Sequence, residues 1–132
     1  MKEEIKPFSW QLNHNEEGII EINATGTIDT SSSQAQTKEA FDYARKVNSY
    51  LFLLNFREVT GESTPLRIYE LPRIYHNLGV PRQSKIAVVL PHPKDKLEDY
   101  EFYETVCYNH GYEVELFEEK KHALDWLRLQ RK

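Results

Sequence analysis

The amino-acid sequence predicts an α/β fold, with a mixed sheet of about five strands, an antiparallel first strand and about four helices. Two observations predict this class. Residues 51–56 ("LFLLNF") and 85–91 ("KIAVVLP") are short, mainly apolar runs, typical of strands that are covered on both faces. Around these runs, apolar residues recur three and four positions apart, which indicates helices that alternate with strands.

The 132 residues fit one domain, which we place at residues 1–132. The composition, with 39% hydrophobic and 29% charged residues, is typical of a folded chain. The net charge of −4 is spread along the sequence without a basic stripe, so nucleic-acid binding is not expected. Every apolar run is far shorter than the roughly 20 residues of a membrane span. With the single cysteine Cys107 and no signal-peptide pattern, we expect a reduced, cytoplasmic protein.

The first third of the chain predicts a β-hairpin followed by a helix. Residues 6–12 and 18–24 are extended stretches joined by the polar turn "NHNEE". Asp29, Thr30 and Ser31 are N-cap candidates for a helix that runs to about Asn48. Its core face, spaced three and four apart, consists of Thr37, Ala40, Phe41, Ala44 and Val47.

Beyond the strand at 51–56, the remaining elements alternate in type. Helical spacing at 66–78 contains Pro72, which predicts a kink or two short helices, since proline lacks an amide hydrogen. The strand "KIAVVLP" follows, then a helix over 96–110 that ends before Gly111. A short strand within 112–117 and a helix within 118–132 complete the order ββαβαβαβα.

The order of these elements and the sequence of several segments resemble the STAS family, and within it the small, stand-alone SpoIIAA-like proteins. The resemblance rests on "LFLLNF", on "ELP" and "LGVPR" before "KIAVVLP", on "FYETVCYNHGYEVELFE", and on "HALDWL". It covers about residues 26–127 and implies the STAS fold, which is related to that of CRAL-TRIO lipid-binding domains.

The resemblance implies a non-enzymatic regulatory or protein-interaction domain. In well-studied members, a serine or threonine at the helix after the third strand accepts phosphate from a partner kinase, and this changes which protein is bound. Ser63 is the equivalent candidate here and Thr64 the second, with a kinase or an anti-sigma-type regulator as partner. The surrounding residues differ from the usual acceptor pattern, because Glu62 precedes Ser63 and the glycine, Gly61, comes before it.

The turn at 61–65 also has a purely structural interpretation. Thr64 fits an N-cap and Pro65 the first helical position, where the missing amide hydrogen is not needed. The same helix start could hold an anion or a phosphorylated Ser63, with Arg57 and Arg67 close in sequence. No G-x-x-x-x-G-K-[ST] pattern is present, so the turn is not a P-loop.

We assign no catalytic residue, no metal site and no cofactor from the sequence. Cys107 and His110 are three apart on a predicted helix and could form a thiolate and base pair, but Cys107 lies on the apolar stripe. The five histidines lack metal-ligand spacing. The run "EDYEFYETV" is expected to be a solvated helix face rather than a pair of acid/base carboxylates.

Tyrosines on the predicted second and third helices leave a further alternative open. Tyr69 and Tyr75 are either core residues or part of a partner or pocket surface. The alternative function is a small-molecule or lipid-binding module of the CRAL-TRIO type, with an apolar ligand between sheet and helices. A homodimer is also compatible with the sequence.

Overall fold

The computed structural model describes residues 6–60, 65–91 and 97–130, apart from the side chains of residues 30 and 65–69. Along the chain the elements are β1 (Ser9–His14), β2 (Ile19–Thr27), α1 (Thr30–Val47), β3 (Leu51–Thr60), α2 (Pro65–Asn77), β4 (Lys85–Val89), α3 (Leu97–Asn109), β5 (Glu113–Phe117) and α4 (Lys120–Leu129). The predicted order ββαβαβαβα is confirmed.

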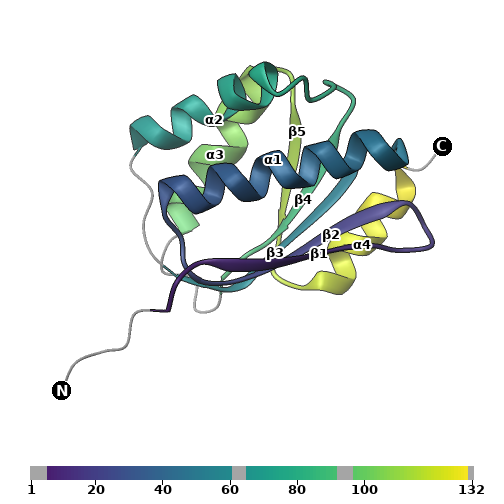
Figure 1. Ribbon diagram of the computed structural model, residues 1–132, viewed down its shortest axis with the longest axis horizontal. Helices are drawn as coiled ribbons and strands as arrows, with labels where there is room; N and C mark the ends of the chain where they lie inside the picture. Colours follow the sequence, from purple (N-terminus) through teal and green to yellow (C-terminus); the bar gives the residue numbers. More distant parts are fainter. Residues whose placement is uncertain (1–5, 61–64, 92–96, 131–132) are drawn as a thin grey trace.

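One mixed sheet carries the fold, with its five strands in the order β1-β2-β3-β4-β5. The pair β1 and β2 is antiparallel, and the other three neighbouring pairs are parallel. Each parallel strand is added on the same side of the previous one, so right-handed crossovers place α1, α2 and α3 on one face of the sheet. Helix α4 covers the other face (Figure 1).

The core therefore has two layers, one on each face of the sheet. In β4, Ile86 and Val88 belong to the larger cluster under α1, α2 and α3, whereas Ala87 and Val89 belong to the smaller cluster under α4. All four are at most 2% exposed. The prediction that the run starting at Lys85 is covered on both faces is thus confirmed, and the alternation of side chains along a strand explains it.

Helix α1 begins and ends at residues suited to those positions. The Asp29 carboxylate accepts a hydrogen bond from the Ser32 amide at 2.9 Å, and Asn48 ends the helix in the left-handed conformation, with a φ of 54°. The predicted core face is largely confirmed, because four of its five residues are buried and Val47 is partly buried.

Of the two alternatives predicted at Pro72, a kink or two short helices, the second is wrong, because α2 is one helix with Pro72 inside it. A proline removes one hydrogen bond from a helix, and packing can offset that loss. Pro72 is almost completely buried, and the neighbouring Leu71 and Tyr75 pack in the larger core cluster. Burial of this face explains why the helix continues.

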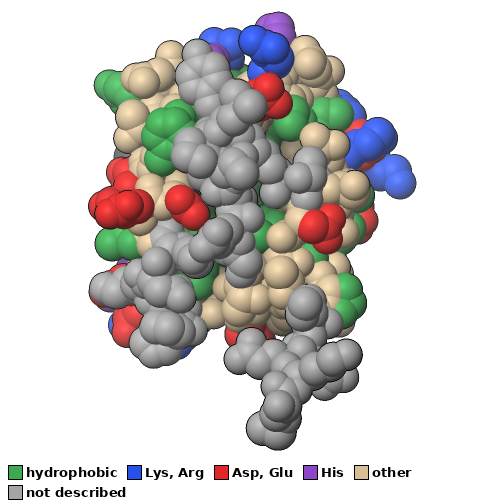
Figure 2. Space-filling model, turned by 90° about the vertical axis from the view of Figure 1, so that its left-hand side faces the viewer, with side chains coloured by type: hydrophobic (Ala, Val, Ile, Leu, Met, Phe, Trp, Pro, Cys, Tyr) green, Lys and Arg blue, Asp and Glu red, His purple; other side chains and the backbone are tan. Residues whose placement is uncertain are grey.

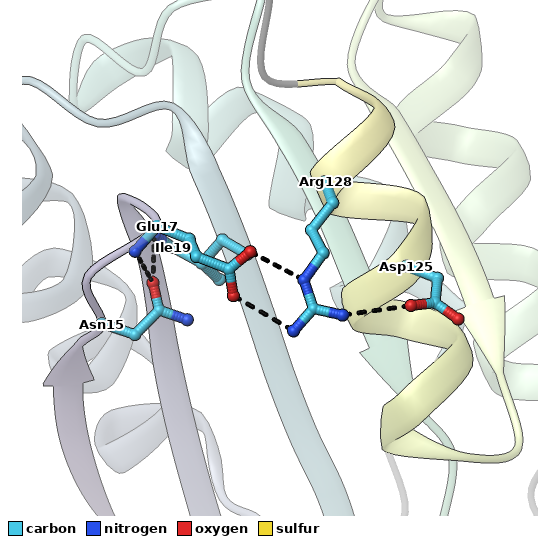
Figure 3. Close-up of polar contacts among 5 residues, drawn as sticks. All are labelled: Asn15, Glu17, Ile19, Asp125 and Arg128. Carbon is cyan, nitrogen blue, oxygen red and sulfur yellow. Dashed lines mark hydrogen bonds and ion pairs between the residues drawn. The ribbon is translucent and has the colours of Figure 1, made fainter.

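The turn between β1 and β2 is tied to α4 by polar contacts (Figure 3). Asn15 Oδ1 accepts hydrogen bonds from the amides of Glu17 at 2.9 Å and Ile19 at 3.0 Å, as in an Asx-turn. The Glu17 carboxylate in turn accepts hydrogen bonds from Arg128, from Nε at 2.7 Å and from Nη2 at 3.1 Å. Arg128 also donates to Asp125 at 3.1 Å. These groups are partly exposed, so the contribution to stability is modest.

No helix within the described residues is long and apolar enough to cross a membrane.

Candidate functional site

An apolar cavity of about 90 Å³ lies between the sheet and helices α1, α2 and α3. Strands β2, β3 and β4 supply its floor, and the helices supply its walls. The floor consists of Ile22, Phe52, Leu54, Phe56, Ile86 and Val88. Apart from Phe56, which belongs to a separate cluster with Phe8 and Ala24, these side chains lie in or against the larger core cluster.

The cavity spans the middle of the sheet and reaches toward the end at which the parallel strands finish. Its α1 residues, which include Ser33 and Gln36, come from the first half of that helix, and Asp99 and Tyr100 come from the first turn of α3. Helices α1, α2 and α3 all begin toward the left-hand side of Figure 1. Ligands of open α/β sheets commonly bind at this end.

Gln36 is the most unusual polar residue of the cavity. Its side chain is only 5% exposed, yet it makes no hydrogen bond to any residue in the described part of the chain. Its neighbour Thr37 is different, because the Thr37 hydroxyl donates to the Ser33 carbonyl at 2.9 Å. The Gln36 amide atoms are not fully buried, since Ser84 Oγ is the one fully buried and unpaired side-chain atom among the described residues. The amide is therefore free to bond a ligand.

Two buried tyrosines form a polar contact in the wall of the cavity. The hydroxyls of Tyr75 and Tyr103 are 2.6 Å apart. Burial raises the pKa of both phenols well above the ordinary value, so both are neutral. Because these hydroxyls satisfy one another, they can remain in an otherwise apolar wall.

Tyr100 and Asp99 stand together where α3 begins. Burial, and secondarily the negative charge of Asp99, raises the pKa of the Tyr100 phenol, which keeps its proton. Asp99 is partly exposed and forms no ion pair with any Lys or Arg among the described residues. This part of the cavity therefore holds a hydroxyl donor beside a carboxylate.

The phosphoacceptor candidates Ser63 and Thr64 lie outside the described residues, as do the side chains of Arg67 and Tyr69. The helix start beside them is described: α2 begins at Pro65, the position that the capping pattern predicts. Arg57 is exposed on β3, which continues to Thr60 and is longer than the apolar run predicts. Tyr75 is 5% exposed and lines the cavity.

Cys107 and His110 do not form a thiolate and base pair. Cys107 is completely buried, and burial raises the pKa of its thiol to about 12. His110 is exposed, and its Nδ1 lies 2.9 Å from the Val106 carbonyl oxygen. In the described part of the chain, no group of three or more His, Cys, Asp or Glu residues could hold a metal ion.

Ser33 and Gln36 line the cavity although neither was predicted as a site residue. Continuing the helical spacing of the core face toward the N-terminus places Ser33 four residues before Thr37, and Gln36 four before Ala40. Polar residues at predicted core positions of a helix could therefore have indicated a polar group in the cavity wall. Asp99 was assigned to the solvated face, although it lines the cavity.

Comparisons with known proteins bear on the fold. No model of a known protein family matches the sequence, and no curated protein matches it. A solved structure does match: an uncharacterized protein from the DUF3478 family with a SpoIIAA-like fold, from Shewanella loihica PV-4. The two chains are 18% identical, with a TM-score of 0.57 over 96% of this chain and 98% of that one. The chain described here therefore has a SpoIIAA-like fold.

Proposed function

We propose that this domain is a non-enzymatic regulatory module that binds a small, mainly apolar molecule in the cavity between the sheet and helices α1, α2 and α3. The observation that carries the proposal is the apolar cavity with the Gln36 amide in its wall, an amide that makes no hydrogen bond within the described residues. Ligand sites are typically apolar hollows with a few convergent polar groups, and this cavity has that composition.

The lining favours binding over catalysis. Its hydroxyls belong to Ser33, Thr37 and tyrosines, and among the described residues none of them is hydrogen-bonded to a histidine, lysine or carboxylate that could remove its proton. The walls come from three helices, so occupancy would influence how these helices pack and which surface they present. A ligand could in this way regulate a protein partner.

Native mass spectrometry of the protein purified from its own host tests the proposal. We expect a reproducible additional mass on the unmodified chain and its loss in Ala40→Leu, because leucine at this cavity position occupies the space. Ala35→Leu is the matched control on α1, since Ala35 is exposed, and it should retain the mass. If the unmodified chain carries no mass and no small amphiphile raises its Tm, the proposal is wrong.

A second candidate function is control of partner binding by phosphorylation at Ser63, or at Thr64. The start of α2 at Pro65 favours it, because a phosphate just before a helix can interact with free amides and the helix dipole. Arg57 and Arg67 would be the supporting cations, and a kinase or anti-sigma-type regulator the partner. Ser63→Asp should change the affinity for that partner severalfold, relative to Ser63→Ala. Equal affinities for both variants and the unmodified chain would exclude the switch.

A further inference from the structure

The charges around the cavity restrict what can enter it. Among the described residues of the lining, Asp99 is the one that carries a formal charge at neutral pH, and none is Lys, Arg or His. A ligand carboxylate placed here would lose its hydration without gaining a described cation, and it would face the Asp99 carboxylate. The described part of the lining therefore disfavours anions.

The starts of α1 and α3 do not offset this negative charge. A helix N-terminus is equivalent to roughly half a positive charge, and α1 and α3 both begin near the cavity. However, the Asp29 carboxylate already caps α1, accepting the Ser32 amide at 2.9 Å, and α3 has Glu98 and Asp99 in its first turn. Figure 2 shows the side on which these helices begin. Acidic side chains are visible on the left and right of that face at mid-height, and most of the visible Lys and Arg lie at its upper and right-hand margins.

The polar groups available to a ligand are suited to an uncharged partner. The Gln36 amide offers both a donor and an acceptor, and Tyr100 offers a hydroxyl that makes no hydrogen bond within the described residues. An alcohol or a primary amide can donate to one of these groups and accept from the other. An ammonium group could pair with Asp99, but it has no acceptor role to offer the donors of Gln36 and Tyr100.

The size of the cavity limits the part of the ligand that is enclosed. Its volume of about 90 Å³ is smaller than the ~150 Å³ of an engineered apolar cavity that binds benzene. At ~30 Å³ per water-sized group, the space holds about three such groups. The enclosed part is therefore a short chain of few carbons, and anything longer must extend toward the mouth.

We propose that the cavity selects an uncharged, short-chain ligand with a hydroxyl or amide group, that Gln36 binds this group, and that Asp99 excludes carboxylates. This inference rests on the proposed function, because it assigns a ligand class to the same cavity. Asp99 is here a specificity-determining residue, and Gln36 is the recognition residue.

Titration of the ¹⁵N-labelled protein, followed by NMR, with 1-hexanol, hexanoate and hexylammonium as probes of equal chain length tests the inference. We expect 1-hexanol to perturb the amide signals of cavity residues with a Kd at least tenfold lower than that of hexanoate. Asp99→Asn should lower the Kd for hexanoate about fivefold or more and change that for 1-hexanol less than twofold. Glu101→Gln, an exposed acid on the same helix, is the matched control and should change neither.

The contribution of Gln36 is tested with the variant Gln36→Leu, which keeps a similar volume and removes the amide. We expect about a fivefold or larger rise in the Kd for 1-hexanol, with no gain for hexanoate. If hexanoate or hexylammonium binds the unmodified chain as tightly as 1-hexanol does, the inference is wrong, although the cavity is still a binding site. If none of the three probes perturbs the cavity signals, both the inference and the proposed function fail.

Discussion

Gly26→Ala is expected to lower the free energy of unfolding by roughly 3 kcal/mol or more. Gly26 has a φ of +91°, which side chains rarely allow, and an added Cβ would lie 2.0 Å from the Pro7 carbonyl oxygen. The clash is with backbone, so no side chain can rotate to relieve it. Strain and steric overlap therefore act together, and the midpoint of urea denaturation should fall accordingly.

Gly18→Ala is the matched control for this prediction. Gly18 also has a positive φ, of +80°, but an added Cβ would meet no atom within 4 Å. Only the backbone strain remains, and a loss of about 1 kcal/mol is expected. Equal losses in the two variants would contradict the close approach of the chain at Pro7 to Gly26.

This close approach also affects the cavity. The Thr27 amide donates to the Lys6 carbonyl at 2.8 Å, and an isolated bridge joins Pro7 to Thr27. Together these contacts hold Phe8, which is 5% exposed, in a cluster with Ala24 and Phe56 beside the cavity floor. Gly26→Ala should therefore displace Phe8 and loosen the wall of the cavity as well as destabilise the fold.

Much of the fold could be predicted because several local signals agree. Apolar runs marked β3 and β4, helical spacing marked the helices, and Asp29 and Pro65 marked two helix starts. These local signals gave the wrong extent of an element where tertiary contacts determine it. Pro72 is tolerated because its face of α2 is buried, and β3 extends beyond its apolar run because its later residues pair with β2 across a register shift.

The cavity could be predicted only in outline. An apolar ligand between the sheet and the helices was the alternative interpretation, and Tyr75 was among the candidate pocket residues. A cavity is the difference between the volume that the elements enclose and the volume of their side chains, and neither spacing nor composition reports that difference. Gln36 acquires its significance from a missing hydrogen bond, which becomes visible only when its neighbours are placed.

Alkaline pH is expected to destabilise this protein strongly, by several kcal/mol between about pH 9 and about pH 12. The buried groups Tyr75, Tyr103 and Cys107 all have a raised pKa, chiefly because burial disfavours the charged form. In the unfolded chain they lose their protons near their ordinary pKa values of 10.0 for tyrosine and 9.0 for cysteine. The folded chain then holds more protons than the unfolded chain, so stability falls as pH rises.

The pH window follows from these pKa values. The stabilising effect of the thiol is complete below about pH 9 and is lost as pH rises toward about 12, and that of the two phenols starts to fall above about pH 10. Each such group contributes a slope of ~1.4 kcal/mol per pH unit.

The double variant Tyr75→Phe with Tyr103→Phe tests this origin of the pH dependence. It removes both hydroxyls and leaves neither unpaired, and it should flatten the slope of stability against pH above pH ~10. Tyr108→Phe, at a residue that is 76% exposed, should not change it. A double variant that loses stability as steeply as the unmodified chain would show that these buried phenols are not the cause.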